Sequence, residues 1–319
     1  MTSVVLMLPG QGSQFTAMGA ALYYSDPRFS RAFEDFLRAF GPGAERLREV
    51  WLNGTTAELS RGSFAQPLLF GIDYAAGVVW LDELGDADVT LVGHSVGELA
   101  AATLAGVFDL ELAGALLAER ARLLDLAPRG GMIGCRAPAA LVGELLSGQA
   151  VIAAENADDQ CVVSCAEDEI VTMVNRLRSA GISCMRVASS EPFHSPLLRP
   201  AAGEFEAFLV KRSTALSVPR IPMVSAYSAA PVDGRDALPA SFWTRQMAEK
   251  VEFWRALRGT LGGEARKFVE IGPGTVLSMA AKRLPSVRTG LSTVVTTMPR
   301  HLRGIEQWTR IRSEVVAGN

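Results

Sequence analysis

Short apolar runs alternate with longer stretches of helical periodicity along the chain. Four compact apolar runs have the character of buried strands, and they span residues 4–8, 89–92, 221–224 and 267–271. Apolar residues recur at helical spacing in four other stretches, at residues 29–51, 68–81, 98–105 and 110–126. This alternation of strands and helices predicts an α/β fold built on a parallel sheet.

The pattern changes between residues 126 and 190. Short strands are predicted at residues 132–136, 151–154, 161–166 and 183–187, with helices at residues 139–146 and 167–180. Two helices among four strands in this order resemble the split β-α-β arrangement. We therefore expect a small ferredoxin-like α+β subdomain at residues 126–190, inserted in a large α/β-hydrolase-like subdomain made of residues 1–125 and 191–319.

Composition narrows the function classes. The 319 residues carry a formal net charge of −3 with both signs interspersed, which disfavours nucleic acid or a membrane surface as partner. The longest apolar runs are far shorter than a membrane span, and no basic segment of a signal peptide precedes the first run. We expect a monomeric cytoplasmic protein. Its four cysteines form no CxxC pair, which favours buried free thiols over metal or redox chemistry.

Ser95 is the strongest candidate for chemistry. It lies in Gly93-His94-Ser95-Val96-Gly97, between a predicted strand and a predicted helix. Glycines two positions to either side allow a tight turn that projects the serine hydroxyl outward, and the start of the helix offers free N–H groups to an oxyanion. The pattern predicts a nucleophilic serine.

The chain has only three histidines that can act as a base for Ser95. His94 adjoins the serine and is expected to point elsewhere, and His301 lies in a basic C-terminal stretch. His194 lies in an irregular loop, residues 191–196, which is bounded by prolines and suited to reach across a cleft. His194 is therefore the predicted general base.

Together these motifs resemble the malonyl-CoA:acyl carrier protein transacylase family, which includes polyketide-synthase acyltransferase domains and free-standing, trans-acting acyltransferases. The matching segments span nearly the whole chain: residues 9–14, 66–67, 93–98, 193–195 and 270–274. The resemblance implies a ping-pong reaction. Ser95 takes an acyl group from a CoA or carrier thioester and passes it to the phosphopantetheine thiol of an acyl carrier protein, with no bound cofactor.

The resemblance also implies roles for individual residues. Backbone N–H groups of Gln11 and Val96 would form the oxyanion hole, and the backbone carbonyl of Gln246 would orient the imidazole of His194. Arg120 matches the arginine that binds the free carboxylate of a malonyl group, a task suited to a bidentate guanidinium. The remaining residues expected around the acyl group are Gln66, Met132, Glu191 and Phe193.

Glu191 departs from the family pattern, which has histidine or tyrosine three residues before the catalytic histidine. A carboxylate near a malonyl carboxylate repels it in a site of reduced dielectric. The malonyl group implied by Arg120 therefore competes with a second hypothesis. In that hypothesis Glu191 binds an amine, and the enzyme moves an aminoacyl, peptidyl or aminomalonyl group between carriers.

Two different functions stay open at the level of sequence. A serine hydrolase or thioesterase of the α/β type would use His301 as its base, and a non-catalytic carrier-binding protein would keep only the fold. The segment from Lys282 to Arg312 has seven basic residues and one acidic residue, Glu306. This charge suits the acidic helices of a carrier protein, and a solvated face explains it equally well.

Overall fold

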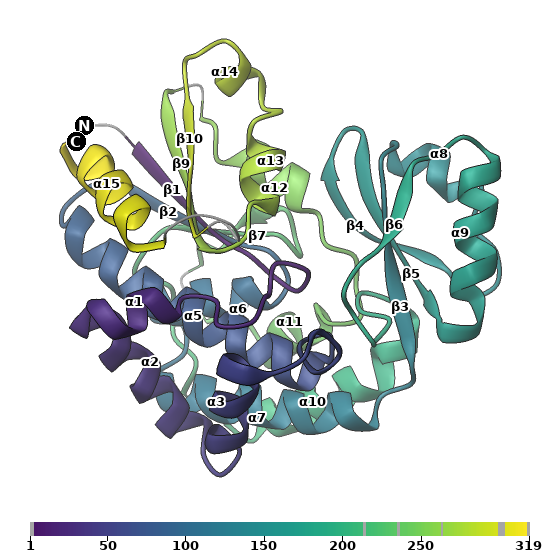
Figure 1. Cartoon of the computed structure of the whole chain (residues 1–319), viewed down its shortest axis with the longest axis horizontal. Helices are drawn as coiled ribbons and strands as arrows, with labels where there is room; N and C mark the ends of the chain where they lie inside the picture. Colours follow the sequence, from purple (N-terminus) through teal and green to yellow (C-terminus); the bar gives the residue numbers. More distant parts are fainter. Residues whose placement is uncertain (1–2, 213–214, 235–236, 263, 299–303, 318–319) are drawn as a thin grey trace.

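A computed structural model describes residues 3–212, 215–234, 237–262, 264–298 and 304–317. Two sheets organise the chain, and Figure 1 shows most of the helices packed around the larger one. All neighbouring strands of the larger sheet are parallel except the last two. Its strands in spatial order are β10 (Thr293–Met298), β9 (Arg266–Pro273), β1 (Ser3–Leu8), β2 (Val89–Gly93), β7 (Met223–Ser225) and β8 (Ala230–Pro231).

Helices connect and cover these strands. Because β1 is covered on both faces, every one of its residues is buried, which explains the uninterrupted apolar run from Val4 to Leu8. The helices outside the smaller sheet are α1 (Ala20–Ser25), α2 (Pro27–Phe40), α3 (Ala44–Asn53), α4 (Thr56–Leu59), α5 (Gly62–Leu84), α6 (Val96–Leu104), α7 (Leu110–Leu126), α10 (Arg199–Val210), α11 (Ala240–Arg245), α12 (Phe253–Gly259), α13 (Val276–Ala281), α14 (Pro285–Arg288) and α15 (Gly304–Ala317), with the 3-10 turn η2 (Pro196–Leu198).

Helix α5 runs through the centre of this part of the protein. Among the described residues it is the one helix long and apolar enough to cross a membrane by length and composition, yet 78% of the qualifying window is buried inside the fold. It packs against α2, α6, α7 and β9. Its apolar sequence is therefore explained by its place in the core.

The smaller sheet is antiparallel and forms a separate layer, on the right of Figure 1. Its chain order, strand-helix-strand-strand-helix-strand, and its spatial order β4-β5-β3-β6 are those of a ferredoxin-like unit. The elements are β3 (Gly130–Cys135), α8 (Ala139–Gly143), β4 (Val151–Ala157), β5 (Gln160–Ala166), η1 (Glu167–Glu169), α9 (Ile170–Ser179) and β6 (Cys184–Arg186). The predicted fold class is confirmed. The proposed division at residues 125/126 and 190/191 stays a prediction.

Two predicted helices of the larger subdomain differ clearly from those in the structure, and in the smaller one α8 ends at Gly143, three residues before the predicted end. The stretch at residues 29–51 is split into α2 and α3, because α2 ends at Gly41, whose φ of 87° favours glycine. Helix α5 begins at Gly62 rather than after Pro67, so Pro67 lies inside it. Pro67 has no N–H and cannot donate a helical hydrogen bond. The burial of α5 on all sides offsets that loss of stability.

The smaller sheet begins earlier than the sequence pattern predicts. Gly130 and Gly131 belong to β3, where they pair with Ala166 and Cys165. A Cβ on Gly130 would lie 2.6 Å from the carbonyl oxygen of Cys165, so the strands approach too closely there for any side chain. These glycines lie within the strand and allow its close packing. A pair of glycines in a loop would have the same sequence, so the pattern alone does not tell the two cases apart.

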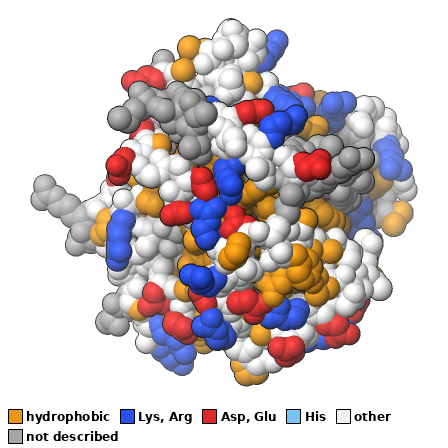
Figure 2. Space-filling view, turned by 60° about the vertical axis from the view of Figure 1, so that its left-hand side comes forward, with side chains coloured by type: hydrophobic (Ala, Val, Ile, Leu, Met, Phe, Trp, Pro, Cys, Tyr) orange, Lys and Arg blue, Asp and Glu red, His pale blue; other side chains and the backbone are white. Residues whose placement is uncertain are grey.

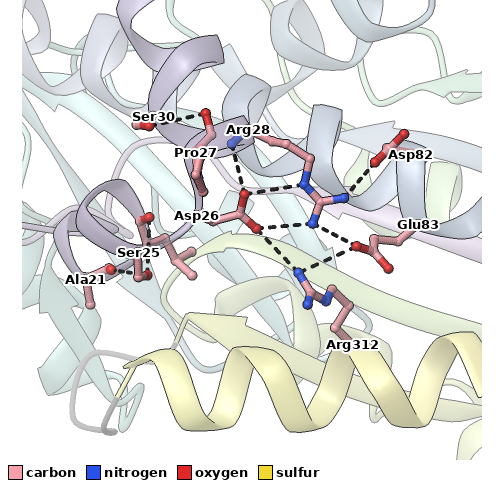
Figure 3. A network of polar contacts seen from close by, with 10 residues as sticks. Ala21, Ser25, Asp26, Pro27, Arg28, Ser30, Asp82, Glu83 and Arg312 are labelled. Atoms are coloured by element: carbon pink, nitrogen blue, oxygen red, sulfur yellow. Dashed lines mark hydrogen bonds and ion pairs between the residues drawn. The ribbon is translucent and has the colours of Figure 1, made fainter.

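The C-terminal helix α15 is fixed to the larger subdomain by a network of charged side chains, which Figure 3 shows from close by. The guanidinium of Arg312 lies 3.4 Å from the carboxylate of Asp26 and 3.6 Å from that of Glu83. Arg28 pairs with the same two carboxylates at 3.2 and 2.7 Å. Arg312, one of the seven basic residues considered above, is thus engaged within the protein.

The face drawn in Figure 2 has charges of both signs. Figure 2 shows acidic and basic side chains interspersed across it, next to a group of hydrophobic side chains. The side chains coloured in this view therefore give the face a mixed charge.

Candidate active site

Ser95 lies at the sharp turn between β2 and α6. The register aligns Leu8 with Gly93, so the loops that follow β1 and β2 leave the sheet side by side. Ser95 has φ 54° and ψ −119°, a strained conformation for a residue with a side chain. A Cβ on Gly97 would lie 2.2 Å from the carbonyl oxygen of Leu8, and a Cβ on Gly93 would lie 2.2 Å from the backbone nitrogen of Glu98. Glycine is therefore required at both flanking positions.

His194 faces Ser95. Ser95 Oγ and His194 Nε2 are 2.8 Å apart, and the two residues are only 5% and 4% exposed. On the other side of the ring, Nδ1 lies 2.8 Å from the carbonyl oxygen of Gln246 and 2.9 Å from that of Glu249. Because carbonyl oxygens only accept hydrogen bonds, the ring proton lies on Nδ1, and Nε2 is free to accept the serine proton.

The electrostatics keep this imidazole neutral. Burial lowers the pKa of His194 to about 3, and His94 and Arg120 contribute in the same direction. A neutral ring at physiological pH is the form that a general base requires. The backbone N–H of His194 donates to the carbonyl of Met247 at 2.9 Å, so the same short segment holds both the ring and the main chain.

His94 points away from the site, toward the smaller sheet. Its Nε2 lies 2.9 Å from Oδ1 of Asn156 in β4, and its ring packs 5.3 Å from that of Phe253. Strand β4 also contacts the segment that holds His194, because Ala154 forms an isolated bridge with Val251. The smaller sheet thus contacts both the residue next to the nucleophile and the segment behind the base.

The two residues expected to form the oxyanion hole, Gln11 and Val96, lie next to Ser95 in the chain or in space. Val96 is the first residue of α6, so its N–H has no acceptor within the helix. Gln11 follows Gly10, and a Cβ on Gly10 would lie 3.2 Å from Cβ of Ser95, so the loop after β1 passes directly against the nucleophile. Both positions fit an oxyanion hole.

Arg120 of α7 is fully buried, with an exposed fraction of 0%. Its Nε donates to Oε1 of Gln66 at 2.5 Å, and Nε2 of Gln66 donates to Oε1 of Gln11 at 3.2 Å. Among the described residues, both terminal nitrogens of Arg120 are buried without a hydrogen-bond partner. Burial lowers the pKa of Arg120 to about 10, so the guanidinium stays charged at neutral pH. Two free donors on a buried cation can bind a carboxylate.

The side chain of Glu191 lies beside the first residue of α5, and one of its carboxylate oxygens accepts the N–H of Gly62 at 2.9 Å. Burial raises the pKa of Glu191 to about 7, against the lowering effect of that N–H group. Phe193 closes over the same glycine, since a Cβ on Gly62 would lie 2.7 Å from Cζ of Phe193. Met132 and Phe193 both belong to the main hydrophobic core.

Sequence reasoning missed the carbonyl of Glu249 and the contact between His94 and Asn156. A backbone acceptor has no residue signature, so Glu249 leaves no trace in the sequence. Asn156 lies in the predicted small subdomain, and nothing in the sequence near it indicates a contact with His94. The base of the hydrolase hypothesis, His301, lies outside the described residues, as do Arg300 and Arg303.

Comparisons with known proteins agree with this geometry. The acyl transferase domain family matches residues 5–316. Mycoketide-CoA synthase of Mycobacterium tuberculosis is 35% identical over 297 residues, which cover 92% of this chain and 7% of that protein. The acyltransferase domain from the second module of the salinomycin polyketide synthase has a TM-score of 0.85 and 30% identity, covering 97% of this chain and 72% of that one. FabD from Acinetobacter baumannii has a TM-score of 0.84 and 26% identity, covering 100% and 99% of the two chains.

These relatives confirm the predicted resemblance to malonyl-CoA:acyl carrier protein transacylases and polyketide-synthase acyltransferase domains. The chain spans less than a fifth of the length of the curated relatives that it matches first. A hydrolase is not supported. Because the family match runs through nearly all of the sequence, the chain belongs to the acyl transferase domain family, and it is an acyltransferase.

Proposed function

We propose that this acyltransferase moves a malonyl-type dicarboxylic acyl group, through an acyl-enzyme on Ser95, to the phosphopantetheine thiol of an acyl carrier protein. The contact between Ser95 Oγ and His194 Nε2, at 2.8 Å, carries the covalent mechanism. The unpartnered terminal nitrogens of buried Arg120 support the dicarboxylic acyl group.

In the first half-reaction, His194 Nε2 takes the proton of Ser95 as Oγ attacks the thioester carbonyl. The oxyanion accepts hydrogen bonds from the N–H groups of Gln11 and Val96, which are stronger there because the site is shielded from water. The tetrahedral species collapses, the C–S bond breaks, and the leaving thiolate takes the proton from His194. The acyl group is then an ester of Ser95.

The second half-reaction runs in the opposite direction with the carrier thiol. His194 takes the thiol proton, the sulfur attacks the Ser95 ester, and the proton returns to Oγ as the new thioester leaves. The carbonyls of Gln246 and Glu249 keep the same tautomer in place throughout. Neutral carbonyls stabilise the imidazolium less than a carboxylate does, which fits a weak base that releases its proton readily.

Arg120 supports a dicarboxylic donor by its energetics. A buried guanidinium without a counter-ion is costly, and breaking a buried ion pair typically costs about 3–5 kcal/mol. The free carboxylate of a malonyl group would satisfy both terminal nitrogens at once, while Gln66 fixes Nε and so the orientation of the fork. A neutral acyl group leaves the cation unpaired.

Glu191 opposes this proposal less than its charge suggests. With a pKa raised to about 7, a large share of Glu191 is protonated near neutral pH. The cations that act on its carboxyl are Arg129 and Arg61, and burial is the one cause of the pKa shift of Arg120. Since Gly62 already donates to Glu191, the hypothesis of an amine-binding Glu191 has less support than the dicarboxylic one.

A donor panel tests the proposal. Purified protein is offered malonyl-, acetyl- and butyryl-CoA, a malonyl-carrier and an aminoacyl-carrier, together with an acceptor carrier protein, and the loaded carrier is weighed. We expect malonyl groups to be transferred fastest. Faster transfer of neutral or amino acyl groups overturns the dicarboxylic assignment. Release of free acid in place of carrier loading overturns acyl transfer to a carrier.

A further inference from the structure

Phe205 lies on α10, which packs against the helix that carries Arg120. The buried residues of α10, Ala202, Phe205 and Leu209, recur at helical spacing, and α10 contacts α7. On α7 every buried residue except Arg120 is leucine, alanine or glycine. Arg120 is therefore a cation on a helix face that is otherwise apolar, and Phe205 is an aromatic residue of a neighbouring helix.

The guanidinium of Arg120 lies over the ring of Phe205. Its carbon Cζ is 5.8 Å from the centre of the ring, within the distance at which an aromatic face attracts a cation. Arg120 is 0% and Phe205 1% exposed, so water screens this attraction little. A ring face accepts the charge without supplying a conventional acceptor, and both terminal nitrogens of Arg120 have no hydrogen-bond partner among the described residues. The contact with Phe205 thus leaves those nitrogens available to a ligand.

Gln66 holds the guanidinium at a different point. Its Oε1 accepts the N–H of Nε at 2.5 Å. One hydrogen bond lets a planar group pivot about that bond, whereas a ring packed near Cζ restrains the pivot. A carboxylate that binds both terminal nitrogens binds best when the plane of the guanidinium is already fixed. Gln66 and Phe205 together supply that restraint.

We propose that Phe205 is a positioning residue for Arg120, whose ring holds the buried guanidinium and fixes the orientation in which its terminal nitrogens meet the acyl group. This inference rests on the proposed function, because the ligand of those nitrogens is the free carboxylate of a dicarboxylic acyl group. Phe205 acts through Arg120 in this role. Its effect should therefore appear only with donors that carry a second carboxylate.

Stepwise fluorination of the ring tests the proposal, because fluorine withdraws electron density from the ring face and changes the size of the side chain little. Phe205 is replaced in the full chain by 4-fluoro-, 3,5-difluoro- and 3,4,5-trifluorophenylalanine, and kcat/KM is measured with malonyl- and acetyl-CoA. We expect kcat/KM for malonyl-CoA to fall with each added fluorine, by about tenfold in total, as the loss of a desolvated cation–π contact predicts. Acetyl transfer should not change.

Phe208 of the same helix is the matched control. The guanidinium of Arg212 lies 3.8 Å from the centre of its ring, and Arg212 is exposed. The same three fluorinated residues at position 208 weaken a cation–π contact that does not involve Arg120. We expect these variants to keep the wild-type kcat/KM for both donors. A comparable loss of malonyl transfer in the Phe208 series would overturn the specific role of Phe205.

Thermal unfolding separates this inference from the proposed function, because it requires no donor. The change in thermal midpoint on fluorination of Phe205 should be more unfavourable in wild type than in Arg120→Met, which lacks the cation. Equal changes in both backgrounds overturn the contact, since a ring that only fills the core gives that result.

The donor series then decides the role of the contact. A flat malonyl series in Phe205, in a protein whose Arg120→Ala variant loses malonyl transfer selectively, overturns the positioning role and leaves the proposed function intact. Equal losses for malonyl- and acetyl-CoA in the Phe205 series also overturn that role. If Arg120→Ala impairs both donors alike, the proposed function fails, and the positioning role fails with it.

Discussion

The two ends of the active site differ in how completely their polar groups are paired. At the nucleophile, His194 bonds Ser95 through one ring nitrogen and two carbonyls through the other. At the opposite end, Arg120 donates from Nε to Gln66, and its terminal nitrogens have no hydrogen-bond partner in the described part of the chain. Buried polar groups in proteins are nearly always paired. The catalytic pair is thus complete in the free protein, whereas under the proposed function the carboxylate of the acyl group would supply the partner that Arg120 lacks.

Removal of the His194 side chain eliminates the hydrogen bond to Ser95 at the end of the site where the polar groups are paired. We expect His194→Ala to slow acylation of Ser95 by roughly 10²–10⁴-fold, the usual contribution of a positioned general base. His94→Ala is the matched control, because His94 is bonded to Asn156 and not to Ser95. Rapid-quench mass spectrometry of the acyl-enzyme measures both rates. A His194→Ala rate near that of wild type, or a larger loss in His94→Ala, contradicts the assigned roles.

Removal of the Arg120 guanidinium should impair the transfer of malonyl groups more than the transfer of acetyl groups. Arg120→Ala should lower kcat/KM for a malonyl donor by about a hundredfold or more, as expected for the loss of roughly 3 kcal/mol from a desolvated charge pair. Acetyl transfer should change little. Arg122→Ala is the control on the same helix, since Arg122 is exposed and pairs with Glu119. Equal losses for malonyl and acetyl donors would show that Arg120 does not bind the second carboxylate.

The depressed pKa of His194 makes acylation insensitive to mild acid. With a pKa of about 3 the ring stays neutral down to pH 5, so kcat/KM for acylation should be nearly flat between pH 5 and 8. For a base with the ordinary pKa of about 6.5, the neutral fraction at pH 5 would be only about one thirtieth. The profile is measured in wild type and in Glu191→Gln, because Glu191 titrates nearby. An inflection near pH 6.5 in both proteins would refute the depressed pKa.

Of these variants, Glu191→Gln should have the smallest effect, and we expect it in the thermal midpoint of unfolding. Burial raises the folded pKa of Glu191 from 4.5 to about 7, so its contribution to stability is present below pH 4.5 and is lost as pH rises through 7. Glutamine keeps an acceptor for Gly62 N–H and cannot ionise. The variant should therefore gain in thermal midpoint over wild type at pH 8 and differ little at pH 5. An equal difference at both pH values would argue against a raised pKa.

The sequence predicts the surroundings of Ser95 well because local signals agree there. Strand β2 is a short, largely apolar run that ends in glycine, and α6 begins at the residue after Ser95. The bounds of α7 match the prediction, since the side chain of Asp109 accepts the N–H of Leu112 and fixes the start of the helix. These elements depend on neighbouring residues, which a single sequence displays.

Features that depend on distant parts of the chain cannot be predicted in this way. Nothing near Arg120 in the sequence indicates burial, and its role rests on family resemblance until the structure places it against Gln66 of α5. The contact of His194 with the carbonyl of Glu249 and that of Arg120 with Phe205 arise only when separate segments pack together. Tertiary contacts, not local pattern, set those features.

The central claim is that Ser95 carries the acyl group, and intact-mass analysis tests it most directly. The protein is mixed with malonyl-CoA without a carrier, quenched in acid and weighed, and the modified peptide is sequenced. We predict a gain of one malonyl group per chain on the peptide that contains Ser95, with no gain in Ser95→Ala and loss of the group when carrier protein is added. An adduct that persists in Ser95→Ala, or that maps to another residue, would contradict the account.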